Sequence, residues 1–267
     1  MPLSVSVFGS TGRMGKMIVK AVFNTEGMIL KKAMARPGSA YIGADIGDLV
    51  GIGSLGVEVT DDLKAVLEVN VSVDFTLPEA TIMHASYAAA NGTSLVIGTT
   101  GLSNKHEELL ANYAKTTAIV YAPNMSLGIN LITALVEQLS ATLDITWDIE
   151  IIELHHNRKV DAPSGTALSI GRAAAKSRGQ EFENVKVLSR NTSTYQRKQG
   201  DIGFAALRGG SVIGEHTVMF ASAGERIEIS HKASDRAIFA AGAICAARWV
   251  ANRPPGLYTM RDVLGID

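Results

Sequence analysis

Two histidines and a lysine stand close together near the middle of the chain, where they could handle protons and bind an anion. His155, His156 and Lys159 lie in the run ELHHNRKVDAPSGTA, which extends from Glu153 to Ala167. Histidine can donate or accept a proton near neutral pH, and lysine carries a compact positive charge. These residue types at this spacing indicate a pocket for an anionic molecule that needs a proton.

The elements on either side of this run would hold it in place. Residues Ile145 to Leu154 alternate between apolar and polar side chains, which predicts a strand that ends at the two histidines. Pro163 and Ser164 then predict the start of a helix whose body runs from Ala167 to Ala175. A helix N-terminus presents free backbone N–H groups and partial positive charge, so it suits a carboxylate or a phosphate.

A second group of residues with chemical meaning is a glycine-rich turn at the start of the chain. Gly9, Gly12 and Gly15 follow the spacing G-x-x-G-x-x-G, between an apolar strand at Ser4–Phe8 and a helical pattern at Lys16–Phe23. Glycines at such a strand-to-helix turn let a pyrophosphate approach the backbone closely. The order of strand, turn and helix favours a dinucleotide site over an ordinary glycine-rich turn, with Gly15 serving helix packing.

The residues that end the second predicted strand bear on which dinucleotide binds. An acidic residue is expected about 20 residues beyond the last glycine, where it would hold the 2′-hydroxyl of the ribose. The strand Met28–Ala35 ends instead with Ala35, and Arg36 follows it. A carboxylate would repel a 2′-phosphate and an arginine can pair with one, so the sequence predicts NADPH in preference to NADH. NADH stays an alternative because an arginine can also stack on adenine, and the plain alternative for Arg36 is a solvated loop charge.

The composition is that of a folded globular protein without a strong charge. Of the 267 residues, 46% are hydrophobic and 19% are charged, and the net charge of −1 gives no electrostatic reason to expect nucleic acid as a partner. No apolar run is long enough to cross a bilayer and no signal segment precedes the first strand, so we expect a cytoplasmic protein. The single cysteine, Cys245, rules out an internal disulfide, and we expect it to be packed in the core within an apolar helix.

Strands and helices alternate from Ser4 to about Ser126, which predicts a parallel sheet with helices on both faces. Further strands are expected at Val71–Phe75, Ser94–Ile97 and Ala118–Ala122, and helices at Glu79–Asn91 and Asn104–Ala114. Ligands of such sheets bind at the carboxyl ends of the strands. The segments Gly98-Thr99-Thr100 and Ala122-Pro123-Asn124-Met125 follow two of these strands, so they are candidates to line one cofactor cleft together with Gly9.

The second part of the chain follows a different pattern. A long helix at Leu127–Leu143 leads into it, and a helical pattern returns from Asp235 to Val250. Strands are expected at Asp148–Leu154, Val185–Ser189, Gly203–Arg208, Val212–Ala221 and Arg226–Lys232, with hairpin turns at Gly209-Gly210 and Ala223-Gly224. This pattern describes an α+β domain with a mixed or mainly antiparallel open sheet, and helices are obvious for only one of its faces. We infer that the other face packs against partner subunits.

The chain is therefore expected to divide into two domains. Residues 1–126 together with 236–267 would form a dinucleotide-binding domain, and residues 127–235 would form a domain for substrate binding and oligomerisation. The closing segment, Gly256–Leu264, is expected to return to the first domain.

Several of these segments together resemble the dihydrodipicolinate reductase family. The segments are Val7–Gly15, Val73–Thr76, Gly98–Gly101, Asn124–Gly128, Gly214–His216, His231–Ser234, Met260–Leu264 and, above all, Glu153–Ala167. The resemblance runs nearly end to end, and its most specific part is the His-His-x-x-Lys run with the Ser-Gly-Thr helix start. It implies a Rossmann-type parallel-sheet domain plus an α+β domain, assembled as a homotetramer through the open sheets.

The resemblance also implies a reaction and the residues that carry it. Members of the family use NAD(P)H to reduce 4-hydroxy-tetrahydrodipicolinate, a cyclic dicarboxylate, to tetrahydrodipicolinate in diaminopimelate and lysine biosynthesis. By similarity, His155 is the proton donor or acceptor, and Lys159 is a second donor that also pairs with a substrate carboxylate. His156 would be a substrate ligand, and Gly165 and Thr166 would donate to the other carboxylate from backbone and side chain.

The resemblance likewise assigns the cofactor site, and it implies no metal. The cofactor residues are Gly9, Ser10, Thr11, Gly12, Arg13, Met14, Arg36, Gly98, Thr99, Thr100, Ala122, Pro123, Asn124 and Met125. This sequence departs from some members in having Ala35 where an acid often stands, which favours NADPH, and Met125 where an aromatic residue is sometimes found. Arg158 and Asp161 are interpreted as loop charges, and Arg236 is a weaker candidate for contact with cofactor or substrate.

Three other functions would use some of the same residues. Another NADP-linked reductase of a small dicarboxylate would share the architecture, but a semialdehyde dehydrogenase needs a nucleophilic cysteine and Cys245 lies in an apolar helix. A metal-dependent hydrolase would use His155, His156 and Asp161, although adjacent histidines do not project toward one metal ion and no third ligand is evident. A non-catalytic NADPH sensor would not need the His-His-x-x-Lys pocket.

Overall fold

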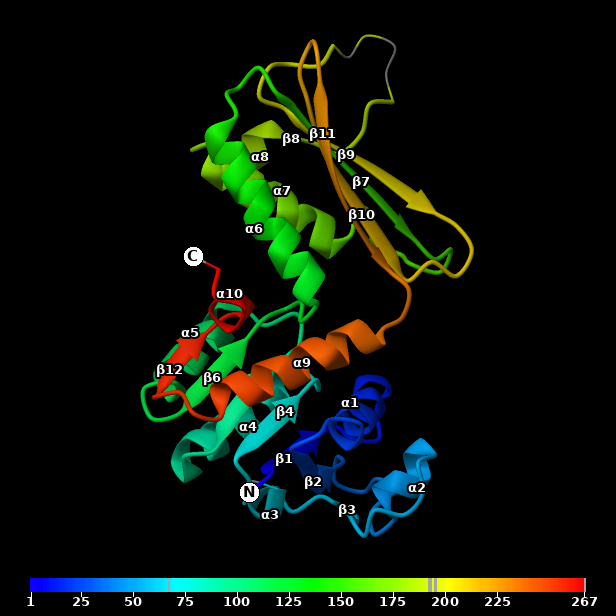
Figure 1. The fold of residues 1–267 in the computed structure, drawn as a ribbon, viewed down its shortest axis with the longest axis vertical. Helices are drawn as coiled ribbons and strands as arrows, with labels where there is room; N and C mark the ends of the chain where they lie inside the picture. The colour runs from blue at the N-terminus through cyan, green and yellow to red at the C-terminus, as the bar shows by residue number, and fades with distance from the viewer. Residues whose placement is uncertain (67, 192–193, 195, 267) are drawn as a thin grey trace. The chain divides into compact units, whose positions relative to one another are not determined.

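The computed structural model describes residues 1–66, 68–191, 194 and 196–266, and this part of the chain folds into two compact units (Figure 1). Unit 1 contains Met1–Leu127 and the segment from Ala237 onward, and unit 2 contains Gly128–Arg236. Within the described ranges each unit has one sheet, seven-stranded in unit 1 and five-stranded in unit 2. The chain thus leaves unit 1, builds unit 2 and returns.

The sheet of unit 1 has the strand order β12-β6-β5-β4-β1-β2-β3, and its neighbouring strands are parallel. Its strands are β1 (Leu3–Phe8), β2 (Met28–Met34), β3 (Val59–Thr60), β4 (Val71–Asp74), β5 (Ser94–Ile97), β6 (Ala118–Tyr121) and β12 (Gly256–Tyr258). Because β1 lies between β2 and β4, the strand order reverses at β1. Sheets of this kind bind their ligands at the carboxyl edge beside such a reversal.

Helices cover both faces of this sheet. They are α1 (Arg13–Phe23), α2 (Ile46–Val50), α3 (Leu63–Val66), α4 (Pro78–Asn91), α5 (Asn104–Tyr113), α9 (Ala237–Val250) and α10 (Met260–Leu264). Along β1, Val5 and Val7 join an apolar cluster with buried residues of α1 and α9, whereas Phe8 joins a second cluster with residues of α4 and α5. The predicted parallel sheet with helices on both faces is confirmed.

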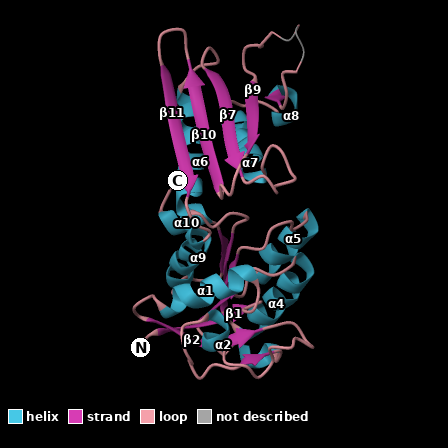
Figure 2. Cartoon of the chain, turned by 90° about the vertical axis from the view of Figure 1, so that its right-hand side faces the viewer, coloured by secondary structure: helices cyan, strands magenta, loops and turns pink. Residues whose placement is uncertain are grey.

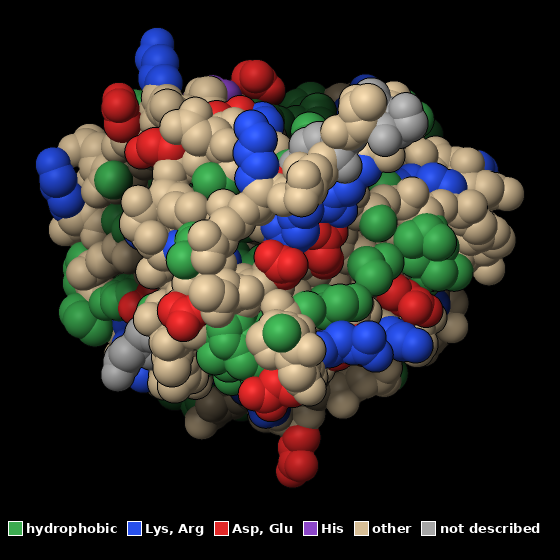
Figure 3. All heavy atoms as spheres, turned by 90° about the horizontal axis from the view of Figure 1, so that it is seen from above, with side chains coloured by type: hydrophobic (Ala, Val, Ile, Leu, Met, Phe, Trp, Pro, Cys, Tyr) green, Lys and Arg blue, Asp and Glu red, His purple; other side chains and the backbone are tan. Residues whose placement is uncertain are grey.

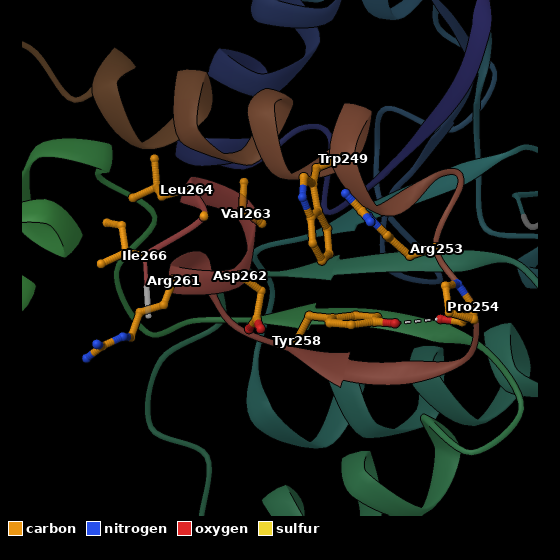
Figure 4. Close-up of a pocket in the computed structure, with 10 residues that line it drawn as sticks. Trp249, Arg253, Pro254, Tyr258, Arg261, Asp262, Val263, Leu264 and Ile266 are labelled. Carbon is orange, nitrogen blue, oxygen red and sulfur yellow. Dashed lines mark hydrogen bonds between the residues drawn. The ribbon is translucent and has the colours of Figure 1, made fainter.

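The C-terminal segment returns to unit 1, as the sequence predicts, and β12 pairs with β6. In Figure 4 the rings of Trp249 and Tyr258 point toward each other, with centroids 5.0 Å apart, and the guanidinium of Arg253 lies 4.2 Å from the Trp249 ring. The hydroxyl of Tyr258 donates to the carbonyl of Pro254 at 3.0 Å. The groove of about 620 Å³ beside these side chains contains none of the residues that the sequence indicates for chemistry, so we interpret these contacts as an anchor for the tail.

The sheet of unit 2 is mixed and has the order β11-β10-β7-β9-β8. Its elements are α6 (Leu127–Thr142), β7 (Asp148–His155), α7 (Gly165–Ser177), α8 (Phe182–Val185), β8 (Lys186–Val187), β9 (Ile202–Arg208), β10 (Gly214–Ala221) and β11 (Arg226–Ala233). β9 runs parallel to β7 and β8, whereas β10 is antiparallel to β7 and β11. The predicted α+β architecture with a mixed sheet is confirmed.

Two details of the predicted strands are wrong. Gly209-Gly210 does not form a hairpin turn. β7 lies between β9 and β10 in the sheet, so the connection from β9 to β10 has to pass over the end of β7. Val185 ends the short helix α8, and the strand that follows is only Lys186–Val187. The other predicted hairpin is correct, since β10 and β11 pair directly and the N–H of Ser222 donates to the carbonyl of Glu225 at 2.9 Å.

The helices of unit 2 lie on one face of its sheet, and Figure 2 shows the sheet from the opposite face. Ile151 of β7 and Val218 of β10 are fully buried in a cluster that also contains Val136 of α6 and Ile170 of α7. The face of the molecule seen in Figure 3 carries basic and acidic side chains interspersed with polar and apolar ones.

Two further predictions concern the burial of the lone cysteine and the length of the apolar helices. Cys245 is half-buried on α9 and is not part of the apolar core, so the expectation of a packed core cysteine is wrong. None of the helices in the described ranges has both the length and the apolar character needed to cross a bilayer.

Candidate active site and dinucleotide pocket

The glycine turn of unit 1 has a geometry that other residues could not adopt without strain. Gly9 has a φ of +62°, and a Cβ atom there would lie 2.8 Å from Cγ2 of Thr76. A Cβ atom on Gly15 would collide with the carbonyl oxygen of Gly9. Gly12 is the N-cap of α1, and no described side chain caps this helix. The first N–H groups of α1 are therefore available to a ligand.

A pocket of about 720 Å³ opens beside this turn within unit 1. Its lining includes Gly9, Thr11, Gly12 and Arg36, and no aspartate or glutamate among the described residues lines it. Ala35 also lines the pocket and is only 2% exposed, so it places no charge there. Free helix N–H groups and an arginine are features that fit a dinucleotide.

The other predicted cofactor residues lie on the same carboxyl edge of the sheet but outside this pocket. Ser10 is buried, and its hydroxyl donates to the carbonyl of Met34 at 3.0 Å, so its side chain holds β2 in place. Arg13 is exposed and Met14 is half-buried at the start of α1. Gly98 is buried after β5, where its missing side chain leaves room for the ring of Phe75.

The segment after β6 is largely built into the core. Ala122 and Met125 are 5% and 1% exposed, and the backbone of Met125 packs against Gly242 of α9 so closely that no side chain would fit there. Pro123 is exposed, and the side-chain oxygen of Asn124 accepts from the N–H of Ser126 at 2.9 Å. Met125 therefore fills the core, and its side chain does not stand in for an aromatic residue in an open site.

A buried acid–histidine pair, which local sequence patterns do not indicate, stands at the end of β4. Asp74 is fully buried and lies 2.7 Å from Nδ1 of His84, while the N–H and the hydroxyl of Thr76 donate to it at 2.8 and 2.6 Å. The ring of His84 stacks on Phe8 with centroids 4.0 Å apart. The Thr81 and Thr99 hydroxyls are 2.8 Å apart in the same network. His84 and Thr76 line the pocket, so this network shapes its wall.

A second buried acid–histidine pair lies at the end of β7 in unit 2. Side chains alternate along this strand, so Glu153 and His155 point to the same face, where they are 1% and 8% exposed. Nδ1 of His155 lies 2.6 Å from Oε2 of Glu153. His156, the next residue, lies just beyond the end of the strand and is half-buried.

The carboxylate of Glu153 holds two further groups. Arg208 at the end of β9 donates to it twice, with Nη1 2.7 Å from Oε2 and Nη2 2.7 Å from Oε1. The N–H of Ser164, the N-cap of α7, donates to Oε1 at 3.0 Å. Burial alone would raise the pKa of Glu153, but these hydrogen bonds and that of His155 outweigh it and lower the pKa. The carboxylate is therefore ionised, and in return it raises the pKa of Arg208.

His216 of β10 completes this buried network, and its sequence neighbours gave no indication of a partner. Its Nε2 lies 3.0 Å from the hydroxyl of Ser164, and its ring meets the ring of His155 edge-on with centroids 5.1 Å apart. Burial, reinforced by the nearby His155, lowers the pKa of His216 to about 4. His216 is therefore neutral near pH 7 and adds no charge beside His155.

Cations gather in the loop between β7 and α7. The pKa of His156 is lowered by burial and then by the charges of Arg236 and Arg158, so this histidine lies in a positive environment. Lys159 pairs with Asp161 at 2.8 Å, and that contact lowers the pKa of Asp161. Asp161 is thus a partner of Lys159 and not merely a loop charge.

The N-terminus of α7 is the other anion-binding feature of this loop. The hydroxyl of Ser164 accepts from the N–H of Ala167 at 3.1 Å, and Gly165 at the first helical position is exposed, with Thr166 half-buried beside it. Because Glu153 binds Ser164, the start of α7 is tied to the His155 pair. No group of three or more histidine, cysteine, aspartate or glutamate side chains in the described part of the chain is arranged to hold a metal ion.

The two units point to one class of protein. A parallel sheet with a glycine turn beside its strand-order reversal is the dinucleotide-binding half of many oxidoreductases, and a separate unit with proton-handling side chains suits their substrate. The chain is an oxidoreductase of the two-domain, NAD(P)-dependent class.

Comparisons with known proteins define the family. Models for the N-terminus and the C-terminus of dihydrodipicolinate reductase match residues 3–125 and 128–264. The 4-hydroxy-tetrahydrodipicolinate reductase of Alkalilimnicola ehrlichii is 49% identical over 267 residues, which is 100% of both chains, and that of Cereibacter sphaeroides is 50% identical over 263 residues, 98% of each. A solved structure of dihydrodipicolinate reductase from Paenisporosarcina sp. TG-14 with dipicolinate bound shares the fold, with a TM-score of 0.79 at 23% identity over 97% of this chain and 98% of that one. This chain belongs to the dihydrodipicolinate reductase family.

Proposed function

We propose that this chain uses NAD(P)H and a proton to reduce 4-hydroxy-tetrahydrodipicolinate to tetrahydrodipicolinate with loss of the 4-hydroxyl group as water, and its relatives are named for this reaction. The observation that carries the proposal is the buried pair of Glu153 and His155 beside the N-terminus of α7, next to a loop that holds Lys159. A cyclic dicarboxylate that must be protonated needs two anion-binding positions and a proton donor. This short stretch of unit 2 contains groups suited to all three tasks.

The substrate carboxylates would take the place of the Asp161 carboxylate, which belongs to the loop between β7 and α7. Asp161 pairs with Lys159, and the backbone of Gly165 also lowers the pKa of Asp161. Lys159 and Gly165 are therefore already disposed toward a carboxylate, and the Asp161 side chain is 60% exposed and free to move away. One substrate carboxylate would bind Gly165 and Thr166 at the start of α7, and the other would bind Lys159.

The histidines would divide the remaining work. His155, held by Glu153 on the buried face, would supply or accept the proton. Burial and the neighbouring cations lower the pKa of His156, so it would bind the substrate as a neutral hydrogen-bonding group.

Unit 1 would bind the dinucleotide, with the pyrophosphate at the start of α1 and the adenosine end near Arg36. The reduced nicotinamide, when bound, supplies the hydride. Since Arg36 lines the pocket and Ala35 contributes no carboxylate, we propose that NADPH is preferred and that NADH is a poorer alternative. The segments Gly98–Thr100 and Ala122–Met125 would shape the rest of the site from the same sheet edge.

The face of the unit 2 sheet that no described helix covers would form an interface between copies of the chain in a homotetramer. Ile152, Leu154 and Met219 are half-buried on this face, and Leu207 is 48% exposed. Native mass spectrometry tests this assembly, and a mass equal to one chain would contradict it. An enzyme that uses a soluble nicotinamide coenzyme and a small dicarboxylate would work in the cytoplasm.

Replacing Lys159 by alanine separates a reductase from a non-catalytic NADPH sensor. The substrate would be generated in place from pyruvate and aspartate semialdehyde by the preceding enzyme, and NADPH oxidation would be followed by absorbance. The reductase proposal predicts that turnover is lost while NADPH binding, measured by fluorescence, is retained. Lys186→Ala is the matched control, since Lys186 pairs with Glu183 on the surface of the same unit. Full turnover by the Lys159→Ala variant would count against the proposal.

A further inference from the structure

A single buried carboxylate connects the groups that unit 2 needs for its chemistry. Glu153 accepts from the ring of His155, twice from the guanidinium of Arg208 and once from the N–H of Ser164, over distances from 2.6 to 3.0 Å. Both of its oxygens are used, and the residue is 1% exposed. Glu153 therefore has no carboxylate oxygen left to bind substrate, so it can affect the reaction only through the residues that it contacts.

The first partner, His155, is fixed in one orientation by this contact. Because the ionised carboxylate can only accept, Nδ1 of His155 must carry the proton, and Nε2 is left to face a reacting group. A Cβ atom on Gly214 would lie 3.0 Å from Nε2, so glycine at the start of β10 leaves space at this nitrogen.

The second partner, Ser164, is the residue that begins α7. Its N–H binds Oε1 of Glu153, while its hydroxyl caps the helix through Ala167 and contacts His216. The position of the helix N-terminus is therefore set by the same carboxylate that orients His155. A substrate bound at this N-terminus would be held at a fixed offset from Nε2.

We propose that Glu153 is a positioning residue for the reduction, one that fixes the tautomer and orientation of His155 relative to the anion-binding N-terminus of α7, with Arg208 neutralising its charge. This proposal rests on the proposed function. The charged and titratable groups that face His155 are Glu153 on its own strand, Arg208 from β9 and His216 from β10, with Lys159 and His156 in the following loop. Of these, Glu153 is the anion in hydrogen-bond contact with the ring.

The same strand has a similar ion pair that serves as an internal control. Arg190 donates to Glu150 with Nη1 2.8 Å from Oε2 and Nη2 2.6 Å from Oε1, the same two-bond geometry as the pair of Arg208 with Glu153. Glu150 lies on the opposite face of β7, and none of its ion-pair or hydrogen-bond partners in the described chain is a histidine. If the pair of Glu153 and Arg208 served only to stabilise the fold, the pair of Glu150 and Arg190 would serve in the same way, and the two glutamate variants would have similar effects.

The first experiment compares the variants Glu153→Gln and Glu150→Gln with the unmodified protein. We expect kcat to fall by roughly 10-fold or more for Glu153→Gln, with KM for NADPH unchanged, because the geometry around Nε2 is lost. Glu150→Gln should change neither quantity. Equal effects of the two variants, or an unchanged kcat for Glu153→Gln, would overturn the proposal.

A second measurement requires neither a folded Glu153→Gln variant nor turnover. Nitrogen NMR of the unmodified protein, with His155 assigned through a His155→Gln variant, reports which ring nitrogen carries the proton. The proposal requires a proton on Nδ1 when the ring is neutral, and a neutral ring protonated on Nε2 would refute it. If the unmodified protein shows the required tautomer but oxidises no NADPH with the substrate, the proposed reaction fails while the orientation by Glu153 stands.

Discussion

Two buried acid–histidine pairs, one in each unit, have nearly the same contact but very different surroundings. Asp74 and His84 are 2.7 Å apart in unit 1, and Glu153 and His155 are 2.6 Å apart in unit 2. In both pairs the histidine uses Nδ1, and in both the acid stands at or near the carboxyl end of a strand.

The difference lies in what else each carboxylate and each ring contacts. Asp74 is surrounded by threonine hydroxyls, and the ring of His84 is stacked flat on Phe8. Glu153 binds Arg208 and the N-terminus of a helix, and the Nε2 side of His155 faces a glycine. An acid–histidine contact therefore does not by itself mark the site of proton transfer. A charge partner on the carboxylate and a glycine beside Nε2 distinguish the pair that we propose for proton transfer from the pair whose histidine lines the pocket of unit 1.

The largest expected change in kcat comes from replacing the histidine of each acid–histidine pair in turn. His155→Gln should lower kcat by about 10²- to 10⁴-fold, the usual contribution of a positioned acid or base. His84→Gln should alter KM for NADPH and lower thermal stability, with kcat close to that of the unmodified protein, because its ring lines the dinucleotide pocket. Steady-state kinetics and thermal unfolding of both variants test this, and comparable losses in kcat would erase the distinction between the pairs.

The next effect concerns stability and its dependence on pH. Arg208→Gln would leave the buried carboxylate of Glu153 without its charge partner, which should cost on the order of 3 kcal/mol at neutral pH. The pKa of Glu153 is lowered in the folded state, so the stabilising contribution is present above the pKa of an unfolded glutamate and is lost as the pH falls through the folded value. Urea unfolding of both proteins should therefore show a difference that is largest near neutrality and shrinks in acid. A difference that grew in acid would contradict the ionised state of Glu153.

A smaller effect tests whether unit 1 selects the coenzyme through Arg36. Arg36→Ala should raise KM for NADPH by about 10-fold through the lost contact with the 2′-phosphate, and it should leave KM for NADH and kcat nearly unchanged. Kinetics with both coenzymes measure this directly. An equal change for NADPH and NADH would show that Arg36 does not read the 2′-phosphate.

The smallest effect probes the space beside Nε2. A methyl group at position 214 would crowd Nε2 of His155, so Gly214→Ala should reduce kcat several-fold without unfolding the protein. Gly209→Ala is the matched control, because a Cβ atom there meets nothing within 4 Å. Unchanged kcat for Gly214→Ala would show that Nε2 is not the reacting nitrogen.

Local patterns were enough to predict most of the fold. The strand Ser94–Ile97 is found as predicted, and α4 ends at Asn91 because Gly92 takes the left-handed conformation. Ser164 is the N-cap of α7, which agrees with the helix start predicted at Pro163 and Ser164. Apolar periodicity and capping residues act over a few positions, so one sequence is sufficient to find them.

The parts that the sequence did not predict depend on contacts between distant positions. Arg208 lies 55 residues beyond the Glu153 that it binds, and His216 lies 52 residues beyond Ser164. The Gly209-Gly210 connection resembles a hairpin turn locally, and only the insertion of β7 into the sheet shows that it is not one. Glu153 belongs to the most specific motif, but the sequence does not indicate that its carboxylate binds groups from three elements, β7, α7 and β9.

The proposed reaction is best tested by NADPH oxidation with the purified protein, with 4-hydroxy-tetrahydrodipicolinate generated in place from pyruvate and aspartate semialdehyde. NADH would be used in parallel, and the reaction without aspartate semialdehyde would serve as the blank. We expect rapid oxidation that depends on the substrate and is faster with NADPH at low coenzyme concentration. If both coenzymes bind and neither is oxidised, the assignment of the substrate to unit 2 is wrong.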